Sequence, residues 1–149
     1  EYSSTIVAST NPHGVCVFTQ GYWKNHPELW PVMSLTLGTV SYTQAQLLAI
    51  LAKPAAGNGL LILAHQLIAT KLNIANGGDP GVVAATVAAA DALIGGLVVP
   101  PVGSGYLTPA SVSALTQVLD DYNNGLIALE HCTTATQTST WGQIKGLYR

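Results

Sequence analysis

Charge is the property that this sequence lacks most. Only 8% of its 149 residues are Asp, Glu, Lys or Arg, against about 25% in an average soluble domain, and the formal net charge is −2. No basic patch is present, so the usual electrostatic basis of nucleic-acid binding is missing. The surface must then consist largely of Thr, Ser, Asn, Gln, Gly and Ala. Weakly charged surfaces repel one another little, which favours self-association.

Long apolar runs are missing as well. No run reaches the roughly 18–20 residues that a membrane-spanning helix needs. The nearest candidate, residues 81–101, contains Thr86 and Asp91 and is interrupted by Gly95 and Gly96. We therefore expect no membrane span, and a chain of this length is expected to form one domain around its own core.

Cysteine is scarce, and its spacing is informative. Cys16 and Cys132 are the only two, they are far apart, and neither belongs to a CxxC or metal-binding pattern. Such a pair indicates one long-range disulfide in an exported protein, worth roughly 4–5 kcal/mol in the chain-entropy model. Two buried free thiols are the alternative. A first residue of Glu1 instead of Met is also what we expect of a processed, secreted chain.

Catalytic motifs are absent too. There is no GxSxG, no phosphate-binding loop and no GxGxxG. His26 beside Glu28 would suit a general base, or a zinc site if His65 joined them. However, no HExxH-like spacing supplies a second ligand, and His65 shares a helical face with Leu61 and Ile68, which predicts a core residue. We therefore expect no catalysis and no cofactor.

Two further clusters have simple alternatives to a metal site. His13 and His131 adjoin the two cysteines, near Glu130, and would approach each other if the disulfide forms. They could then bind a structural metal, or they could be ordinary surface histidines beside a disulfide. We assign no metal. Residues 120–124 offer carboxylate and amide oxygens but lack calcium-loop spacing, and capping of a helix end explains them more simply.

One segment is dense in aromatic and polar residues: TQGYWKNHPELWPV, residues 19–32, here called the aromatic segment. Tyr22, Trp23 and Trp30 would suit stacking on a sugar face. Alternatively, a tryptophan-rich segment bounded by prolines and anchored by Cys16 would close the end of a small helical core. We favour this structural role, with irregular backbone.

The middle of the chain predicts four helices. Each has a start or stop signal, from capping residues, Pro or a Gly pair. The first helix begins at a Thr43/Gln46 capping box and ends before Pro54, and the second runs from Asn58 to Gly77-Gly78. The third begins at Asp79-Pro80, and the fourth runs from Thr108-Pro109 to Asn124-Gly125.

The ends of the chain differ from the middle. Residues 1–18 are rich in β-branched and aromatic residues, and residues 141–148 also suit a strand. The predicted fold class is therefore mainly α, with about four helices closed by one disulfide and short strands or extended arms at both termini. The expected parts are an N-terminal arm (1–15), a helical domain (16–132) and a Thr/Ser-rich C-terminal arm (133–149).

Several motifs stand together in a recognisable order. They are CVFTQGYWKNHPELWP (16–31), SYTQAQLLAIL (41–51), LAHQLIATKLNIANG (63–77), LDDYNNG (119–125) and a closing HC. This order resembles a recurring domain of exported bacterial proteins, whose hallmark is Cys followed by Thr-Gln-Gly-Tyr-Trp-Lys, then Asn or Thr, then His. The resemblance implies a secreted or surface protein with Thr/Ser-rich flanks and supports the disulfide, and it brings no enzymatic activity with it.

These features together predict a secreted structural subunit that polymerises with copies of itself. A terminal arm of one copy would add as a strand to its neighbour. The donor candidates are the apolar residues of the arms: Tyr2, Ile6, Val7, Ile144, Leu147 and Tyr148.

The arms are also candidates for covalent sugars. Exported Thr-rich segments commonly carry O-linked glycans. The candidate residues are Ser3, Ser4, Thr5, Thr10, Thr134, Thr136, Thr138 and Thr140. The alternative to a polymer subunit is a monomeric surface module that binds carbohydrate or protein through Tyr22, Trp23 and Trp30.

Overall fold

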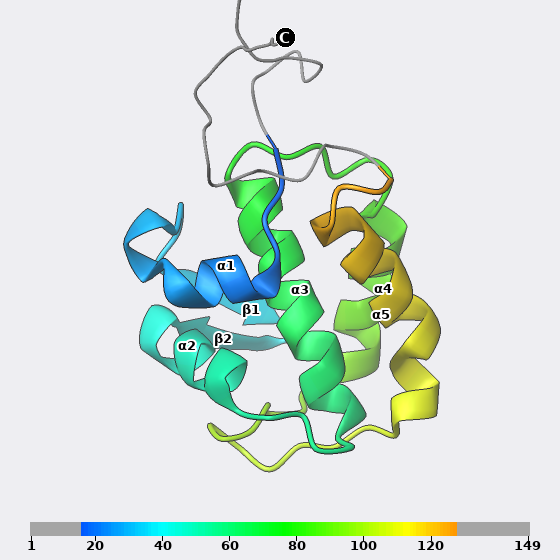
Figure 1. The fold of residues 1–149 in the computed structure, drawn as a ribbon. Helices are drawn as coiled ribbons and strands as arrows, with labels where there is room; N and C mark the ends of the chain where they lie inside the picture. The colour runs from blue at the N-terminus through cyan, green and yellow to red at the C-terminus, as the bar shows by residue number, and fades with distance from the viewer. Residues whose placement is uncertain (1–15, 128–149) are drawn as a thin grey trace, which may run out of the picture.

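The computed structural model describes residues 16–127 and is mainly helical, with one small two-stranded sheet (Figure 1). This confirms the predicted helical class. In chain order the elements are α1 (Gln20–Asn25), the 3-10 helix η1 (Pro27–Leu29), β1 (Ser34–Leu37), β2 (Val40–Thr43), α2 (Gln44–Ala52), α3 (Gly59–Ala75), α4 (Ala84–Ile94) and α5 (Pro109–Asn123).

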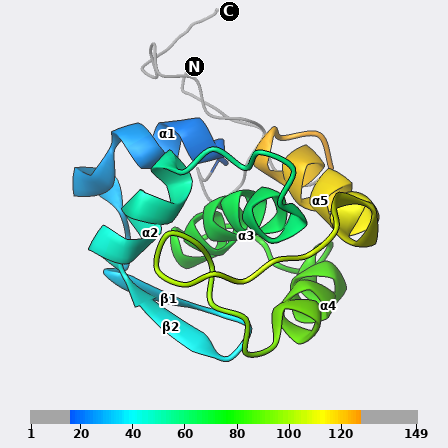
Figure 2. The same cartoon turned by 90° about the horizontal axis from the view of Figure 1, so that it is seen from below.

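Helix α3 is the centre of the domain. It packs against α1, α2, α4, α5 and β1, and Figure 2 shows it enclosed by the other elements. It begins at the predicted cap, because the side chain of Asn58 accepts a hydrogen bond from the Leu60 N–H. Most of its residues are buried, including polar Thr70 and Asn73. A helix that is apolar on nearly all faces is expected to be surrounded in this way.

Two other predicted helices begin where their signals stand. The capping box precedes α2: the Thr43 side chain accepts from the Gln46 N–H, and the Gln46 side chain accepts from the Thr43 N–H. Pro109 occupies the first turn of α5, where its missing N–H costs nothing.

The predicted start of α4 was wrong. Asp79 and Pro80 were expected to cap it, yet the helix begins at Ala84. The Asp79 side chain accepts from the Gly81 N–H, so it closes a local turn instead of capping a helix.

The aromatic segment was predicted to be irregular, and it contains α1 and η1 instead. Thr19 supplies the N-cap, its hydroxyl accepting from the Tyr22 N–H at 3.4 Å. Pro27 then begins η1. The strands predicted in the terminal arms lie outside the described residues.

The β-hairpin of β1 and β2 was not predicted. It is antiparallel, with Leu37 opposite Val40 and Ser34 opposite Thr43. Gly38 occupies the turn at φ +64°, and a side chain there would overlap the carbonyl of Gly95. The Gly38 N–H instead donates to the Asp91 carboxylate at 2.9 Å, which attaches the turn to α4.

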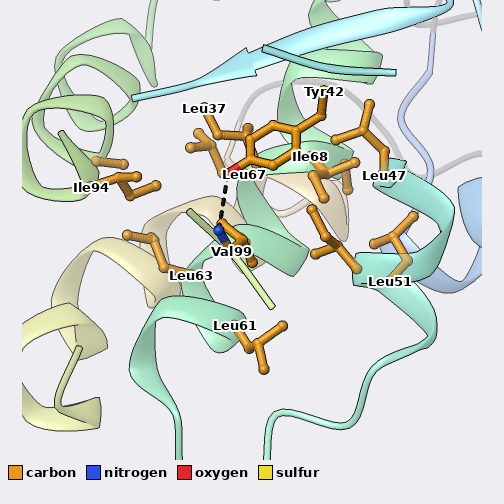
Figure 3. Close-up of a cluster of buried hydrophobic side chains, with 14 of the residues drawn as sticks. Leu37, Tyr42, Leu47, Leu51, Leu61, Leu63, Leu67, Ile68, Ile94 and Val99 are labelled. Atoms are coloured by element: carbon orange, nitrogen blue, oxygen red, sulfur yellow. Dashed lines mark hydrogen bonds between the residues drawn. The ribbon is translucent and has the colours of Figure 1, made fainter. Parts of the chain in front are cut away.

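The main core joins the hairpin to α2, α3 and the loop before α5 (Figure 3). Leu37, Leu47, Leu67 and Ile68 are fully buried there. The hydroxyl of Tyr42 accepts the Val99 N–H at 3.0 Å, so the irregular loop of residues 97–108 is held by a hydrogen bond inside the core.

None of the helices in residues 16–127 combines the length and apolar character required to cross a membrane. Cys16 is not a free cysteine. Its predicted partner Cys132 lies outside the described residues, so their pairing stays a prediction.

Candidate functional site

The two tryptophans of the aromatic segment face inward. Trp23 is 1% exposed and Trp30 is 7% exposed. Their indole N–H groups are also used internally: Trp30 donates to the Trp23 carbonyl at 2.7 Å, and Trp23 donates to the Asn73 side chain at 3.2 Å. Neither ring presents a face on which a sugar would stack, and both fill the core beside α3.

Asn73 is the polar centre of this arrangement. Its side-chain oxygen accepts from the Phe18 N–H at 2.9 Å as well as from Trp23. Its side-chain nitrogen donates to the Phe18 carbonyl at 2.9 Å and to Asn123 at 3.0 Å. One buried amide therefore joins the start of the described chain to α3 and α5.

Asn123 completes the network from α5. Its oxygen accepts from the Thr70 hydroxyl at 3.1 Å, and its nitrogen donates to both the backbone and the side-chain oxygen of Gln66. Because every polar atom of the two asparagines has a partner, the network stabilises one arrangement of the helices. Sequence reasoning had assigned residues 120–124 to capping only. The signal that it missed was an asparagine on the apolar face of each of two helices.

Tyr22 lies in a row of three rings at α1. Its ring stacks on Phe18, with centroids 3.8 Å apart, and lies 4.3 Å from the ring of His26. All three are partly exposed. Only Tyr22 belongs to α1: Phe18 precedes the N-cap Thr19, and His26 is the C-cap. The Phe18 and Tyr22 rings also pack against the main core, so the row attaches α1 to it.

His26 and Glu28 form the pair expected from the sequence, with the two side chains 3.3 Å apart. The pKa of the Glu28 carboxyl lies below its usual range, first because of a hydrogen bond with its own backbone N–H and second because of His26. Both side chains lie at the surface, and no third His, Cys, Asp or Glu joins them in residues 16–127. An exposed pair of this kind contributes little to stability.

His65 lies apart from that pair. One ring nitrogen is 2.8 Å from the Ile50 carbonyl at the end of α2, so the neutral ring donates there. Burial, above all, lowers the pKa of His65. His65 lies on α3 and is only partly buried against α2, so it borders the core in which its helical position predicted it.

We expect the pKa of His65 to make the protein less stable in mild acid. In the unfolded chain the ring takes up a proton near pH 6.5, whereas folded His65 stays neutral to a lower pH. The free energy of unfolding should therefore fall as the pH drops below about 6.5 and level off below the lower pKa of the folded protein. Urea titrations from pH 8 to pH 4.5 measure this. His65→Gln keeps a donor without titrating, and an unchanged pH slope in that variant would refute the assignment.

Lys71 and Asp91 form the other ion pair of residues 16–127, at 2.9 Å. The ammonium also donates to the Thr36 carbonyl of β1, and the carboxylate accepts from the Gly38 N–H. The pair therefore attaches the hairpin to α3 and α4. Its geometry accounts for both residues without a catalytic role.

No group of three or more potential metal ligands occurs within residues 16–127. The oxygens of residues 120–124 serve other contacts: Asp120 accepts from Asn124, and Asp121 accepts from Gln117. Several predicted residues lie outside the described part of the chain. They are the histidines His13 and His131, the donor candidates Tyr2, Ile6, Val7, Ile144, Leu147 and Tyr148, and the candidate glycosylation residues Ser3, Ser4, Thr5, Thr10, Thr134, Thr136, Thr138 and Thr140.

The described surface is weakly charged and carries large apolar side chains. Between residues 92 and 119 the chain has no charged residue and no histidine. Within residues 16–127, eight large apolar side chains are exposed, with Leu126 (70%) the most open: Leu29, Met33, Val82, Leu93, Val102, Tyr106, Leu126 and Ile127. Apolar side chains of this size lose contact with water when another surface covers them, which is favourable.

No protein-family model matches the chain, and no curated protein or solved structure is significantly similar to it.

Proposed function

We propose that this chain is a secreted structural protein, a subunit that assembles with copies of itself into an extracellular fibre or surface layer. The observation that carries the proposal is the surface of residues 16–127, which combines few charges with eight exposed large apolar side chains. A partner with the same weak charge meets little electrostatic repulsion there, and burying those side chains would favour association.

The interior supports a structural role over a binding or catalytic one. His65, a candidate ligand in the sequence, bonds instead to the Ile50 carbonyl of α2. Asn73, which the sequence did not single out, joins Phe18, Trp23 and Asn123 inside the protein. Trp23 and Trp30 are buried, which favours the structural alternative over a sugar-binding platform. We therefore propose no catalytic residue, no cofactor and no metal.

Assembly through a terminal arm needs an acceptor, and the hairpin offers one edge. The Gln44 N–H donates to the Met33 carbonyl, and in an antiparallel hairpin such hydrogen-bonded pairs alternate with non-hydrogen-bonded ones. Counted from this pair, Thr36 and Ser41 form a non-hydrogen-bonded pair, so their backbone N–H and C=O groups point away from the partner strand. On β1, the outward carbonyl of Thr36 already accepts a hydrogen bond from the Lys71 ammonium. On β2, the outward groups of Ser41 have no partner within residues 16–127. This edge is where we propose that an arm adds as a strand.

The proposal includes the covalent chemistry of an exported protein. A Cys16–Cys132 disulfide would close the helical domain, and the resemblance to exported bacterial domains supports it. The Thr- and Ser-rich arms would carry O-linked sugars. Both features suit a protein that must persist outside the cell.

Electron microscopy of native, non-reduced material tests the function, with the particle mass measured in parallel by light scattering. Regular fibres or sheets are expected. A uniform particle with the mass of one chain, at every concentration tried, would contradict the proposal and direct attention to the aromatic row of α1.

A further inference from the structure

The domain has two different ends because α3 and α5 run in the same direction. Near their starts, the Gly59 N–H donates to the Leu107 carbonyl at 2.7 Å. Near their ends, the Tyr122 hydroxyl donates to the Asp79 carbonyl at 3.0 Å. We call the first of these the loop end (residues 53–58 and 97–108) and the second the terminal end (residues 76–83 and 120–127). Figure 1 shows them at the bottom and the top of the domain.

The terminal end is acidic and apolar. It carries Asp79, Asp120 and Asp121, and none of them has an ion-pair partner within residues 16–127. Its exposed apolar side chains are Val82, Leu126 and Ile127. Burial raises the pKa of the Tyr122 hydroxyl there, and the charge of Asp79 adds to the effect.

The loop end has the opposite charge and a similar apolar character. Its segments contain Lys53 and no acidic residue. Lys53 is exposed, and it has no ion-pair partner in the described part of the chain. Val102 and Tyr106 (55%) are the exposed large apolar side chains of this end. Asn58 holds the loop in place by donating to the Gly105 carbonyl at 3.0 Å.

The geometry points to a second copy of this chain as the partner: we propose that the loop end of one copy docks on the terminal end of the next. The inference rests on the proposed self-assembly and adds its polarity. Lys53 would face the three aspartates, and the exposed apolar groups of both ends would be buried together. Such a head-to-tail contact joins two different surfaces, so each added copy presents a new free end and growth continues.

The position of the chain ends supports this direction. Val17 packs against Val83 and Tyr122, so the described chain begins at the terminal end, where it also stops at Ile127. The 15 residues before Cys16 and the 22 after Ile127 therefore continue from the face that would meet the neighbour. Extended, the 15 residues before Cys16 would reach roughly 50 Å, whereas the 17 residues of α3 span about 25 Å. An arm is long enough to reach every part of the next copy.

Three matched positions test the contact in the full, oxidised chain. Tyr106→Glu alters the loop end, Leu126→Lys alters the terminal end, and Leu29→Glu and Leu29→Lys are controls at an exposed apolar residue (50%) of η1, outside both ends and the hairpin. All three side chains are open to solvent, so circular dichroism should show folded protein in each case. We expect the two end variants to raise the minimum concentration for assembly at least tenfold, and the controls to change it less than twofold. Tyr106→Lys should raise the minimum concentration for assembly less than Tyr106→Glu does, because the new ammonium would face the three carboxylates of the neighbouring copy.

Mixing the two end variants tests the polarity itself. Tyr106→Glu keeps a normal terminal end and Leu126→Lys keeps a normal loop end, so an equimolar mixture should give a species of two chain masses and no longer ones. End variants that assemble at the wild-type concentration would overturn the docking while leaving self-assembly intact. A mixture that stays monomeric would overturn the head-to-tail arrangement. Wild-type protein that does not assemble would refute the proposed function, and this inference with it.

Discussion

Asn73→Ala is expected to lower the free energy of unfolding by roughly 3–5 kcal/mol, because it leaves several buried polar groups unpaired at once. The Trp23 indole N–H and both backbone groups of Phe18 lose their partner on α3. Asn123 loses a donor to its side-chain oxygen. Each group left without a hydrogen bond inside the protein costs about 1–3 kcal/mol.

Urea denaturation followed by tryptophan fluorescence measures this, and Trp23 is a reporter at the affected position. Asn76→Ala is the control: it makes the same change one turn later, at an exposed residue, and should change stability by less than about 0.5 kcal/mol. Asn73→Asp tests the acceptor and donor roles of the amide separately. It keeps an acceptor for Trp23 and Phe18 but places a charge beside the Asn123 oxygen, so we expect a loss at least as large as that of Asn73→Ala. Equal stability of Asn73→Ala and Asn76→Ala would show that the network contributes little.

Deleting residues 1–9 is expected to give a folded monomer that does not polymerise. The deletion leaves Cys16 and the whole described body in place, so the helical content and the thermal midpoint should stay close to those of the full chain. It removes Tyr2, Ile6 and Val7, the apolar residues that would fill a neighbour's groove. Because strand addition relies on main-chain hydrogen bonds and inserted side chains, assembly should fall below detection in light scattering and electron microscopy.

Two companion experiments assign the donor. Deleting residues 141–149 removes Ile144, Leu147 and Tyr148, the other candidates; if this arm is the donor, it is this truncation that abolishes fibres. A synthetic peptide of residues 1–9 should bind the shortened chain and slow the assembly of the full chain by occupying the acceptor. Normal fibres from the chain lacking residues 1–9 would exclude that arm as the donor.

The local signals were strong where a side chain acts on its own backbone. The capping box before α2, Asn58 before α3 and Pro109 in α5 each act within a few residues, so their helices were predicted with correct starts. The helix start predicted at Asp79 was wrong although Asp79 also acts on nearby backbone. The side-chain oxygen of Asp79 could accept from the Gly81 N–H in a turn or from an N–H in the first turn of a helix, and the sequence does not distinguish the two.

The hairpin and α1 depended on contacts that no local pattern displays. The turn at Gly38 and Thr39 is bonded to the Asp91 carboxylate of α4 and to the carbonyl of its C-cap Gly95, more than fifty residues further along the chain. The aromatic segment became helical because Trp23 finds both a core and a hydrogen-bond partner on α3. Tertiary contacts of this kind outweigh local propensity.

Composition and spacing alone determined that this protein is mainly helical, weakly charged and without a familiar catalytic motif, because periodicity, capping and charge are properties of the chain itself. Only the tertiary structure decided which polar residues are internal. It buried Trp23 and Trp30, joined Asn73 to Asn123, and separated His65 from His26. It also made α3 and α5 run in one direction, which places Asp79, Asp120 and Asp121 at one end of the domain and Lys53 at the other. The side on which a residue lies depends on how the helices pack, and packing is a property of the whole fold.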